Sequence, residues 1–133
     1  MARMTQEPDA VAQVYKAGGG DEPFFRLVDA FYEGVASDEL LRPMYPQDLS
    51  EPKRNLALFL IQRCGGKPTY STERGHPRMR QRHMPFKIGM FERNAWMHHM
   101  DAALAATPEF ASTRDVMHEF FDGFSLFMMN QPQ

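Results

Sequence analysis

Apolar residues recur at helical spacing over residues 22–36. One face of a helix with about 3.6 residues per turn collects five of them there, namely Phe24, Leu27, Val28, Phe31 and Val35. Asp21 precedes the segment as a candidate N-cap. Pro23 falls in the first turn, where no backbone donor is needed. The pattern therefore predicts a helix over residues 22–36.

Three further segments show the same spacing. Residues 51–64 follow Ser50 as a candidate N-cap and end at a Gly-Gly pair, and residues 88–106 and 109–129 form two more periodic stretches. Each segment is predicted to be a helix. The aligned residues are Leu56, Phe59 and Leu60 in the first, Trp96, Met100, Ala103 and Leu104 in the second, and Met117, Phe120, Phe121, Phe124 and Met128 in the third.

The connecting segments are less regular. Residues 67–77 are predicted to be irregular, and residues 78–83 form a short helix that Pro85 stops. No window alternates polar and apolar residues long enough for a strand. The 133 residues suit one domain. We therefore expect an all-α domain of four main helices with short connectors, preceded by a flexible N-terminal extension over residues 1–11.

The composition is that of an ordinary soluble protein, with 43% hydrophobic and 24% charged residues. The longest apolar run, around Leu56–Ile61, is far too short to span a bilayer. The first ten residues lack the apolar region of a secretory signal, and the single Cys64 has no partner for an internal disulfide. We expect a cytoplasmic protein without membrane insertion.

Charge is unevenly distributed along the chain. The formal net charge is −2, yet residues 53–93 hold ten of the 15 Lys and Arg residues and only two of the 17 acids. The segment therefore carries +8, and its flanks together carry −10. A nucleic-acid surface, a site for a small anion and a pocket rim that holds carboxylates all fit this pattern, and composition alone favours none of them.

One histidine is a candidate iron ligand. None of the five histidines pairs as H-x-x-x-H, so a zinc or di-iron site built from protein alone is not indicated. A single histidine can still bind iron if a porphyrin supplies four ligands. His83 ends the short helix, and Phe86 and Ile88 continue an apolar wall beyond it. Its second ring nitrogen can donate to a carbonyl one turn back. The alternative is a surface histidine in an arginine-rich loop.

Other side chains near such a pocket suit a cofactor and a small ligand. Arg82, Arg74 and Lys87 can meet carboxylates at a rim. The rings of Tyr32, Tyr45 and Trp96 each carry one polar tip, which suits an apolar pocket that hydrogen-bonds a small ligand. Each of these aromatic residues can equally pack in a core and bond to backbone.

Four stretches resemble the group II truncated haemoglobins, and the similarity runs from about residue 12 to residue 131. They are "GGGDEPFFRLVDAFYEGVASDELLRPMYP", "FLIQRCGG", "TYSTERGHPRMRQRHMPFKI" and "ERNAWMHHM", with "GHPRMRQRHMPF" and the later "AW" the most specific parts. The resemblance implies a shortened globin fold, in which two antiparallel helix pairs enclose one haem b and the proximal helix is largely a loop.

The resemblance also implies roles for individual residues. His83 falls on the proximal iron ligand, Arg82 on an arginine that meets a propionate, and Trp96 on the distal tryptophan of the group. Tyr32 and Tyr45 fall on distal tyrosines. The expected cofactor-binding set is His83, Arg82, Tyr70, Arg74, Phe59, Phe86 and Ile88, and the expected distal set is Tyr32, Tyr45, Trp96, Phe31, Pro52 and Leu56.

The chain departs from the family pattern at three places. Pro52 stands where other globins have a distal histidine and group II members usually a small residue. Leu56 replaces a glutamine of some relatives, so neither side chain can donate a hydrogen bond to a ligand. Arg63 and Cys64 replace a pair that is often aromatic.

We therefore expect a haem b protein that binds dioxygen and other diatomic ligands, as in oxygen binding or transport. The alternative is a redox enzyme with the same haem, active in nitric oxide detoxification or peroxidase-like chemistry. Such an enzyme needs a separate reductase, because the sequence shows no flavin or nicotinamide domain. A nucleic-acid module is disfavoured because no recognition helix is apparent. Met and Phe residues near the C-terminus suit either a homodimer interface or the core.

Overall fold

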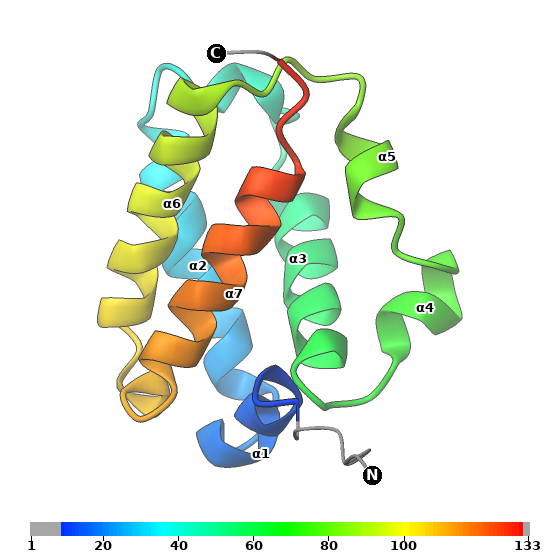
Figure 1. The fold of residues 1–133 in the computed structure, drawn as a ribbon, viewed down its shortest axis with the longest axis vertical. Helices are drawn as coiled ribbons and strands as arrows, with labels where there is room; N and C mark the ends of the chain where they lie inside the picture. Colours follow the sequence, from blue (N-terminus) through cyan, green and yellow to red (C-terminus); the bar gives the residue numbers. More distant parts are fainter. Residues whose placement is uncertain (1–8, 132–133) are drawn as a thin grey trace, which may run out of the picture.

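The computed structural model of the chain describes residues 9–131, and within that range it contains helices and no strand (Figure 1). This confirms the predicted all-α class. None of the helices in the described part is long and apolar enough to cross a membrane. The α-helices are α1 (Val14–Gly18), α2 (Glu22–Ala36), α3 (Ser50–Arg63), α4 (Thr69–Arg74), α5 (Met79–His83), α6 (Met90–Ala105) and α7 (Arg114–Phe127), with 3-10 turns at Val11–Gln13, Arg42–Met44 and Pro108–Phe110.

The helix α2 is the centre of the packing. It contacts both α3 and α6, while α6 also packs on α7 and α3 on α4. Figure 1 shows α7 in front of α2, with α4 and α5 beyond α3 on the far side from α6. All five residues of the predicted apolar face of α2 are buried. Burial of a side chain of this size contributes about 1.5–3 kcal/mol, so this stripe holds the layers together.

The predicted helix over residues 22–36 is confirmed at both ends and Asp21 occupies its predicted N-cap position, but neither Asp21 nor Ser50 makes the expected side-chain cap. The Asp21 side chain does not cap α2 and instead accepts a hydrogen bond from the Tyr15 hydroxyl at 2.8 Å. Ser50 is the first residue of α3 rather than its N-cap, and its backbone N–H donates to the Asp48 carboxylate at 2.9 Å. The Asp21 carboxylate thus bonds to Tyr15 and the Ser50 backbone N–H to a turn, and neither side chain caps the helix that the local sequence suggested.

The segment 67–77 is not irregular throughout, because it contains α4. Tyr70 is only 2% exposed, and its ring packs edge-on against Phe59 at 5.9 Å between centroids. The Gln62 side chain also bonds with Ser71 through both its oxygen and its nitrogen, at 2.9 and 2.7 Å. These contacts with α3 fix a helical turn that periodicity alone could not reveal. Similarly, α7 begins at Arg114, later than predicted, after the turn Pro108–Phe110.

The expected N-terminal extension over residues 1–11 lies mostly outside the described residues. Within the described range, the Asp9 carboxylate accepts a hydrogen bond from Arg63 at 3.0 Å, and a 3-10 turn begins at Val11. Arg63 is one of the two residues before Gly65 at which the chain differs from the group II pattern. It anchors this segment on the end of α3.

Gly65 ends α3 in a conformation that an L residue adopts only with strain, so we expect Gly65→Ala to destabilise the fold. Its φ is +107°, and a Cβ there would collide with the backbone oxygen of Ala12. We expect a loss of about 2–4 kcal/mol in the free energy of unfolding, measured by urea titration. Gly19→Ala is the control, because Gly19 has φ +91° but a Cβ added there would meet no atom within 4 Å. Equal losses in the two variants would contradict the steric argument.

Candidate functional site

A cavity opens between α2, α3, α5 and α6. Its inner part has a volume of about 220 Å³ and continues into an outer cleft of about 660 Å³. Both parts are lined by His83, Arg82, Arg74 and Tyr45, so they form one continuous site. The inner part is lined by Tyr32, Leu41, Met44, Tyr45, Pro52, Asn55, Leu56, Phe59, Tyr70, Arg74, Met79, Arg82, His83, Ile88, Glu92, Arg93, Trp96, Phe124, Ser125 and Met128.

His83 enters this cavity with its tautomer fixed. It is the last residue of α5, and its Nδ1 lies 2.6 Å from the carbonyl oxygen of Met79, one turn back. A carbonyl only accepts, so Nδ1 carries the proton and donates. Nε2 is left with its lone pair, which is the state an iron ligand requires.

Asn130 fixes the segment that follows His83. Its amide nitrogen donates to the carbonyls of His83 at 3.3 Å and Phe86 at 2.7 Å, and its side-chain oxygen accepts from the Ile88 N–H at 2.9 Å. The chain end after α7 therefore holds the loop between α5 and α6 in place. Sequence reasoning missed Asn130, because nothing local connects it to residues more than 40 positions earlier.

Three aromatic donors form one wall of the cavity: Tyr32 from α2, Trp96 from α6 and Tyr45 from the segment that follows the 3-10 turn Arg42–Met44. The rings of Tyr32 and Tyr45 lie 5.4 Å apart and nearly perpendicular, at 88°. Burial raises the pKa of Tyr32, and the nearby Tyr45 acts in the same direction. Burial also raises the pKa of Tyr45 to about 12, while a hydrogen bond from Trp96 acts in the opposite direction. Both hydroxyls therefore remain protonated at neutral pH and can donate.

Phe31 does not line the cavity, contrary to its place in the expected distal set. Its ring is fully buried and stands edge-on to Tyr32 at 5.0 Å and to Trp96 at 5.3 Å. One helical position separates Phe31 from Tyr32, which is enough to turn its side chain away from the cavity. Phe31 instead supports two of the wall residues from behind.

The α3 side of the cavity is mostly apolar. Pro52, Leu56 and Phe59 line the inner part, as expected for residues at helical spacing. Asn55 lies among them, lines both parts of the cavity and was missed by the sequence analysis. Asn55 follows Pro52 by three positions in the sequence, and residues at this spacing share one face of a helix, so the sequence could have indicated that Asn55 also lines the cavity. Asn55 thus adds one polar group to a wall that was expected to have none.

Two arginines stand at the mouth of the cavity. Arg82 donates from Nε to the Pro77 carbonyl at 2.7 Å, and its guanidinium lies 6.0 Å from the centroid of the Tyr70 ring. The Arg74 guanidinium lies 5.7 Å from the same ring. Both guanidinium groups therefore make cation–π contacts with the Tyr70 ring, where the cavity meets solvent. Lys87, considered for the rim, lines neither part of the cavity.

Two apolar residues beyond His83 lie at different depths. Ile88 is 6% exposed and lines the inner part, whereas Phe86 is 41% exposed and lines only the outer cleft. Ile88 therefore belongs to the apolar wall inside the cavity, whereas Phe86 is exposed to solvent beside the outer cleft.

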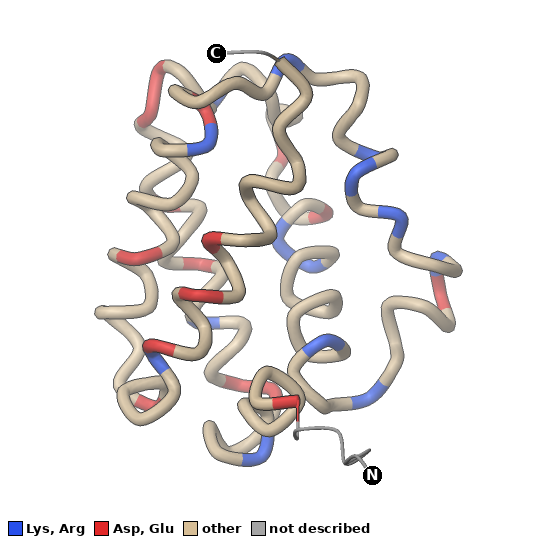
Figure 2. The backbone as a smooth tube through the Cα atoms, in the orientation of Figure 1, with Lys and Arg blue, Asp and Glu red and all other residues tan. Residues whose placement is uncertain are grey.

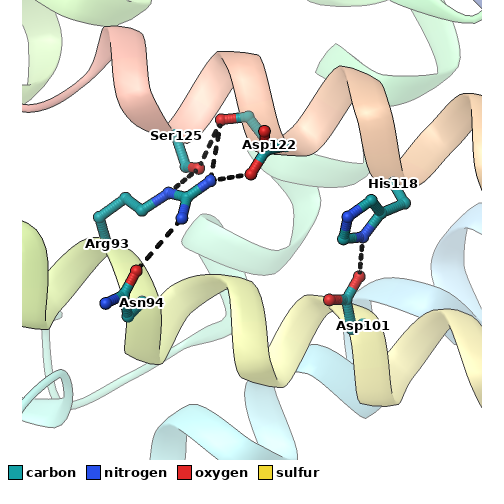
Figure 3. Close-up of polar contacts among 6 residues, drawn as sticks. All are labelled: Arg93, Asn94, Asp101, His118, Asp122 and Ser125. Atoms are coloured by element: carbon teal, nitrogen blue, oxygen red, sulfur yellow. Dashed lines mark hydrogen bonds and ion pairs between the residues drawn. The ribbon is translucent and has the colours of Figure 1, made fainter.

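A polar clamp joins α6 to α7 beside the cavity (Figure 3). Arg93 donates from Nε to the Ser125 hydroxyl at 2.9 Å and forms an ion pair with Asp122. Further along the same helices, His118 and Asp101 bond at 2.7 Å, which raises the pKa of His118. Arg93 lies three positions before Trp96, a spacing that sequence analysis could have used. The clamp fixes the helix that carries Trp96.

The side chains at the cavity fit a flat metalloporphyrin. A neutral imidazole nitrogen is available to a metal, the walls are largely apolar, and two cations at the mouth match two carboxylates. The donors on the far wall suit a small ligand with lone pairs.

Comparison with known proteins gives the same interpretation. The bacterial-like globin family matches residues 13–130. The chain is 47% identical over 85 residues to the group 2 truncated hemoglobin YjbI of Bacillus subtilis, covering 64% of each protein. A hemoglobin from Chloroflexus aurantiacus superposes with a TM-score of 0.87 at 45% identity, over 94% of this chain and 100% of that one. A truncated oxygen-avid haemoglobin from Bacillus subtilis gives a TM-score of 0.84 at 38% identity, over 89% and 99%.

The chain spans less than two thirds of the length of the curated relatives it matches. The superposed structures, in contrast, are covered almost completely. A family match over nearly the whole chain, with close structural agreement, implies globin-type ligand binding with a haem cofactor. The chain therefore belongs to the bacterial-like globin family, as a truncated haemoglobin of group II.

Proposed function

We propose that the chain binds one haem b in this cavity and binds dioxygen and other diatomic ligands there reversibly. The observation that carries the proposal is the orientation of His83, whose Nδ1 bond to Met79 leaves Nε2 available on the cavity side. The oxygen-avid relative from Bacillus subtilis supports dioxygen as a ligand. The lone, buried Cys64 is consistent with action in the cytoplasm.

The chain's own residues would hold the cofactor in three ways. His83 would bind the iron through Nε2, Arg74 and Arg82 would neutralise carboxylates at the mouth, and the apolar walls would exclude water. When bound, the haem would supply an iron that can bind a diatomic ligand. Tyr32, Tyr45 and Trp96 would donate hydrogen bonds to that ligand, each contributing on the order of 1 kcal/mol.

Absorption spectroscopy of the purified, haem-loaded protein tests this proposal. We expect haem to titrate to one equivalent per chain and the ferrous spectrum to change on addition of dioxygen and of carbon monoxide, with the first change reversed by degassing. A protein that takes up no haem, or whose ferrous spectrum ignores both gases, would refute the proposal.

A second candidate function is redox catalysis with the same haem. The observation that favours it is the cluster of three proton donors at one wall, which can deliver protons to a peroxide or hold a reacting ligand. Consumption of nitric oxide in the presence of dioxygen and a reductant, measured with an electrode, would test it. No consumption above that of free haem would leave ligand binding as the proposed function.

Loss of Arg82 is expected to weaken haem retention. Arg82→Ala removes a cation from the cavity mouth, and an exposed charge pair contributes up to about 1 kcal/mol, so haem should transfer to apomyoglobin about fivefold faster. Arg80→Ala is the matched control, because Arg80 lies on the same helix but bonds to the Phe127 carbonyl and lines neither part of the cavity. Equal rates for the two variants would show that Arg82 has no specific role.

A further inference from the structure

The helix α5 and its flanks carry cations that have no carboxylate partner. No acid occurs between Glu73 and Glu92. Within residues 9–131, none of the exposed side chains of Arg78, Arg80 and Lys87 forms an ion pair. Figure 2 shows Lys and Arg along this segment, whereas Asp and Glu are spread over the rest of the molecule, including α2, α6 and α7. The positive charge is therefore concentrated on one side of the molecule.

Apolar side chains are exposed among these cations. Met84 is 52% exposed and Phe127 is 62% exposed. Arg80 connects the two, since its guanidinium lies 5.8 Å from the Phe127 ring centroid and one of its nitrogens lies 3.8 Å from the Met84 sulfur. Phe86, which lines the outer cleft, extends the apolar surface toward the mouth of the cavity. Exposed Met, Phe and Arg in one patch are typical of a protein-binding surface.

We propose that this surface, formed by Arg78, Arg80, Met84, Phe86, Lys87 and Phe127, docks a small acidic electron-transfer protein that reduces the haem. The proposal rests on the proposed function, since it requires haem in the cavity. One electron leaves the reduced carrier, which is oxidised by one electron, and converts ferric haem to ferrous. Ferric haem does not bind dioxygen, so a reductant is needed to maintain the ligand-binding form.

The position and chemistry of the surface favour such a partner. It adjoins the cleft that exposes the edge of the cavity, so a docked carrier comes close to the haem. Unpaired cations attract an acidic surface and raise the association rate. Nucleic acid is disfavoured, because α5 has only five residues, too few to read a groove, and the flanks of the basic segment carry −10. A long phosphate backbone would meet repulsion beyond the patch.

Stopped-flow reduction of the ferric protein by reduced flavodoxin tests the proposal. The variant is Arg78→Glu/Lys87→Glu, which changes two residues outside the cavity lining. The control is Lys16→Glu/Arg114→Glu, which changes two exposed cations without ion pairs in the described part by the same net charge. We expect a rate that falls with ionic strength, and a loss of about tenfold or more at low salt in the α5 variant only.

A second measurement does not depend on electron transfer. Oxidised flavodoxin added to the ¹⁵N-labelled, haem-loaded protein should shift backbone signals of residues 78–87 and of Phe127. Salt-independent rates, equal losses in both variants, or shifts confined to other faces would overturn the proposal. Tight binding of an oligonucleotide that the α5 variant abolishes would assign the surface to nucleic acid and also overturn it. A protein without a haem spectrum would instead refute the proposed function.

An independent observation concerns the segment that presents Tyr45. Arg42 donates three hydrogen bonds to successive carbonyls, from Nη1 to Tyr45 at 3.2 Å and Pro46 at 3.0 Å, and from Nη2 to Gln47 at 2.9 Å. The segment lacks a regular helix to satisfy these groups. Upstream, the Asp38 carboxylate accepts from two backbone N–H groups and bonds with His99 at 2.7 Å.

We infer that Arg42 is a positioning residue for Tyr45. Its planar guanidinium satisfies three acceptors at once, so it fixes the backbone from which the Tyr45 ring reaches Tyr32 and the cavity. Lysine offers one compact ammonium in place of this fork and cannot reproduce the arrangement. The inference rests on the proposed function, because its test measures a ligand bound at the haem; failure to form a carbon monoxide complex would refute that function and not the role of Arg42.

A double-mutant cycle with Tyr45→Phe tests the role of Arg42. We expect Arg42→Ala to speed carbon monoxide or dioxygen dissociation severalfold when Tyr45 is present, and to have little effect in the Tyr45→Phe background. The infrared C–O band of the carbon monoxide complex should broaden or shift in Arg42→Ala, with only partial rescue in Arg42→Lys. The same change in rate and band in both backgrounds would show that Arg42 acts on overall stability and not through Tyr45.

Discussion

Replacing His83 by glycine should leave the protein unable to retain haem, and added imidazole should restore its spectrum. His83 is the histidine that lines the cavity, and its Nδ1 bond to Met79 directs Nε2 to the metal. Loss of a group that only hydrogen-bonds to a metal ligand weakens metal binding about 10–100-fold. We therefore expect loss of the ligand itself to speed haem release by about a hundredfold or more. Haem transfer to apomyoglobin measures the release.

The control for this variant is His76→Ala. His76 lies in the connection between α4 and α5 and is exposed; its Nδ1 accepts a hydrogen bond from the Arg78 N–H at 3.1 Å, and it lines neither part of the cavity. Its haem spectrum should be that of the unmodified protein. An unchanged ferrous spectrum in His83→Gly without imidazole, or loss of haem in His76→Ala, would show that the proximal assignment is wrong.

The helical framework could be predicted from sequence because its signal is local. The apolar face of α2 repeats at helical spacing over residues 22–36, and the same residues are buried. The helix α4 could not be predicted in this way, since six residues give too few repeats. It is stabilised by Tyr70 packing on Phe59 and by the Gln62–Ser71 bonds, and such contacts between distant residues leave no periodic pattern.

The site was predictable where one residue carries distinctive chemistry and unpredictable where contacts cross the fold. His83, Tyr45 and Trp96 stand out as polar groups beside apolar stretches, and the structure brings them to one cavity. Their supports do not stand out. Asn130 and Ser125 are ordinary polar residues near the C-terminus, and their roles depend on helices α5, α6 and α7 meeting at one end. Phe31, which is buried and does not line the cavity, shows that a residue next to a site residue in a helix can face away from the site.

Removal of the Trp96 indole N–H should give the largest change in ligand release among the wall residues. Trp96→Phe keeps an aromatic ring between Phe31 and Phe121 and deletes the donor. Pro52 and Leu56 on the α3 side have no hydrogen to offer in its place, which leaves Asn55 as the polar group of that wall. If the lost bond contributes about 1.4 kcal/mol to the barrier, dioxygen should dissociate about tenfold faster. Stopped-flow displacement of dioxygen by carbon monoxide measures the rate.

The contact between Trp96 and Tyr45 predicts that their effects are not independent. The single Trp96 N–H lies close enough to the Tyr45 hydroxyl to oppose the rise in its pKa that burial causes, so this N–H is shared between the Tyr45 oxygen and a ligand, and the two residues act on the ligand partly through each other. Tyr45→Phe alone should therefore also speed release, by less than Trp96→Phe, and the double variant should release dioxygen roughly 10–30-fold faster, which is less than the product of the two single effects. A product of the single effects would mean separate contacts with the ligand. Rates unchanged in all three variants would mean that these side chains only pack, and that access to the cavity controls release.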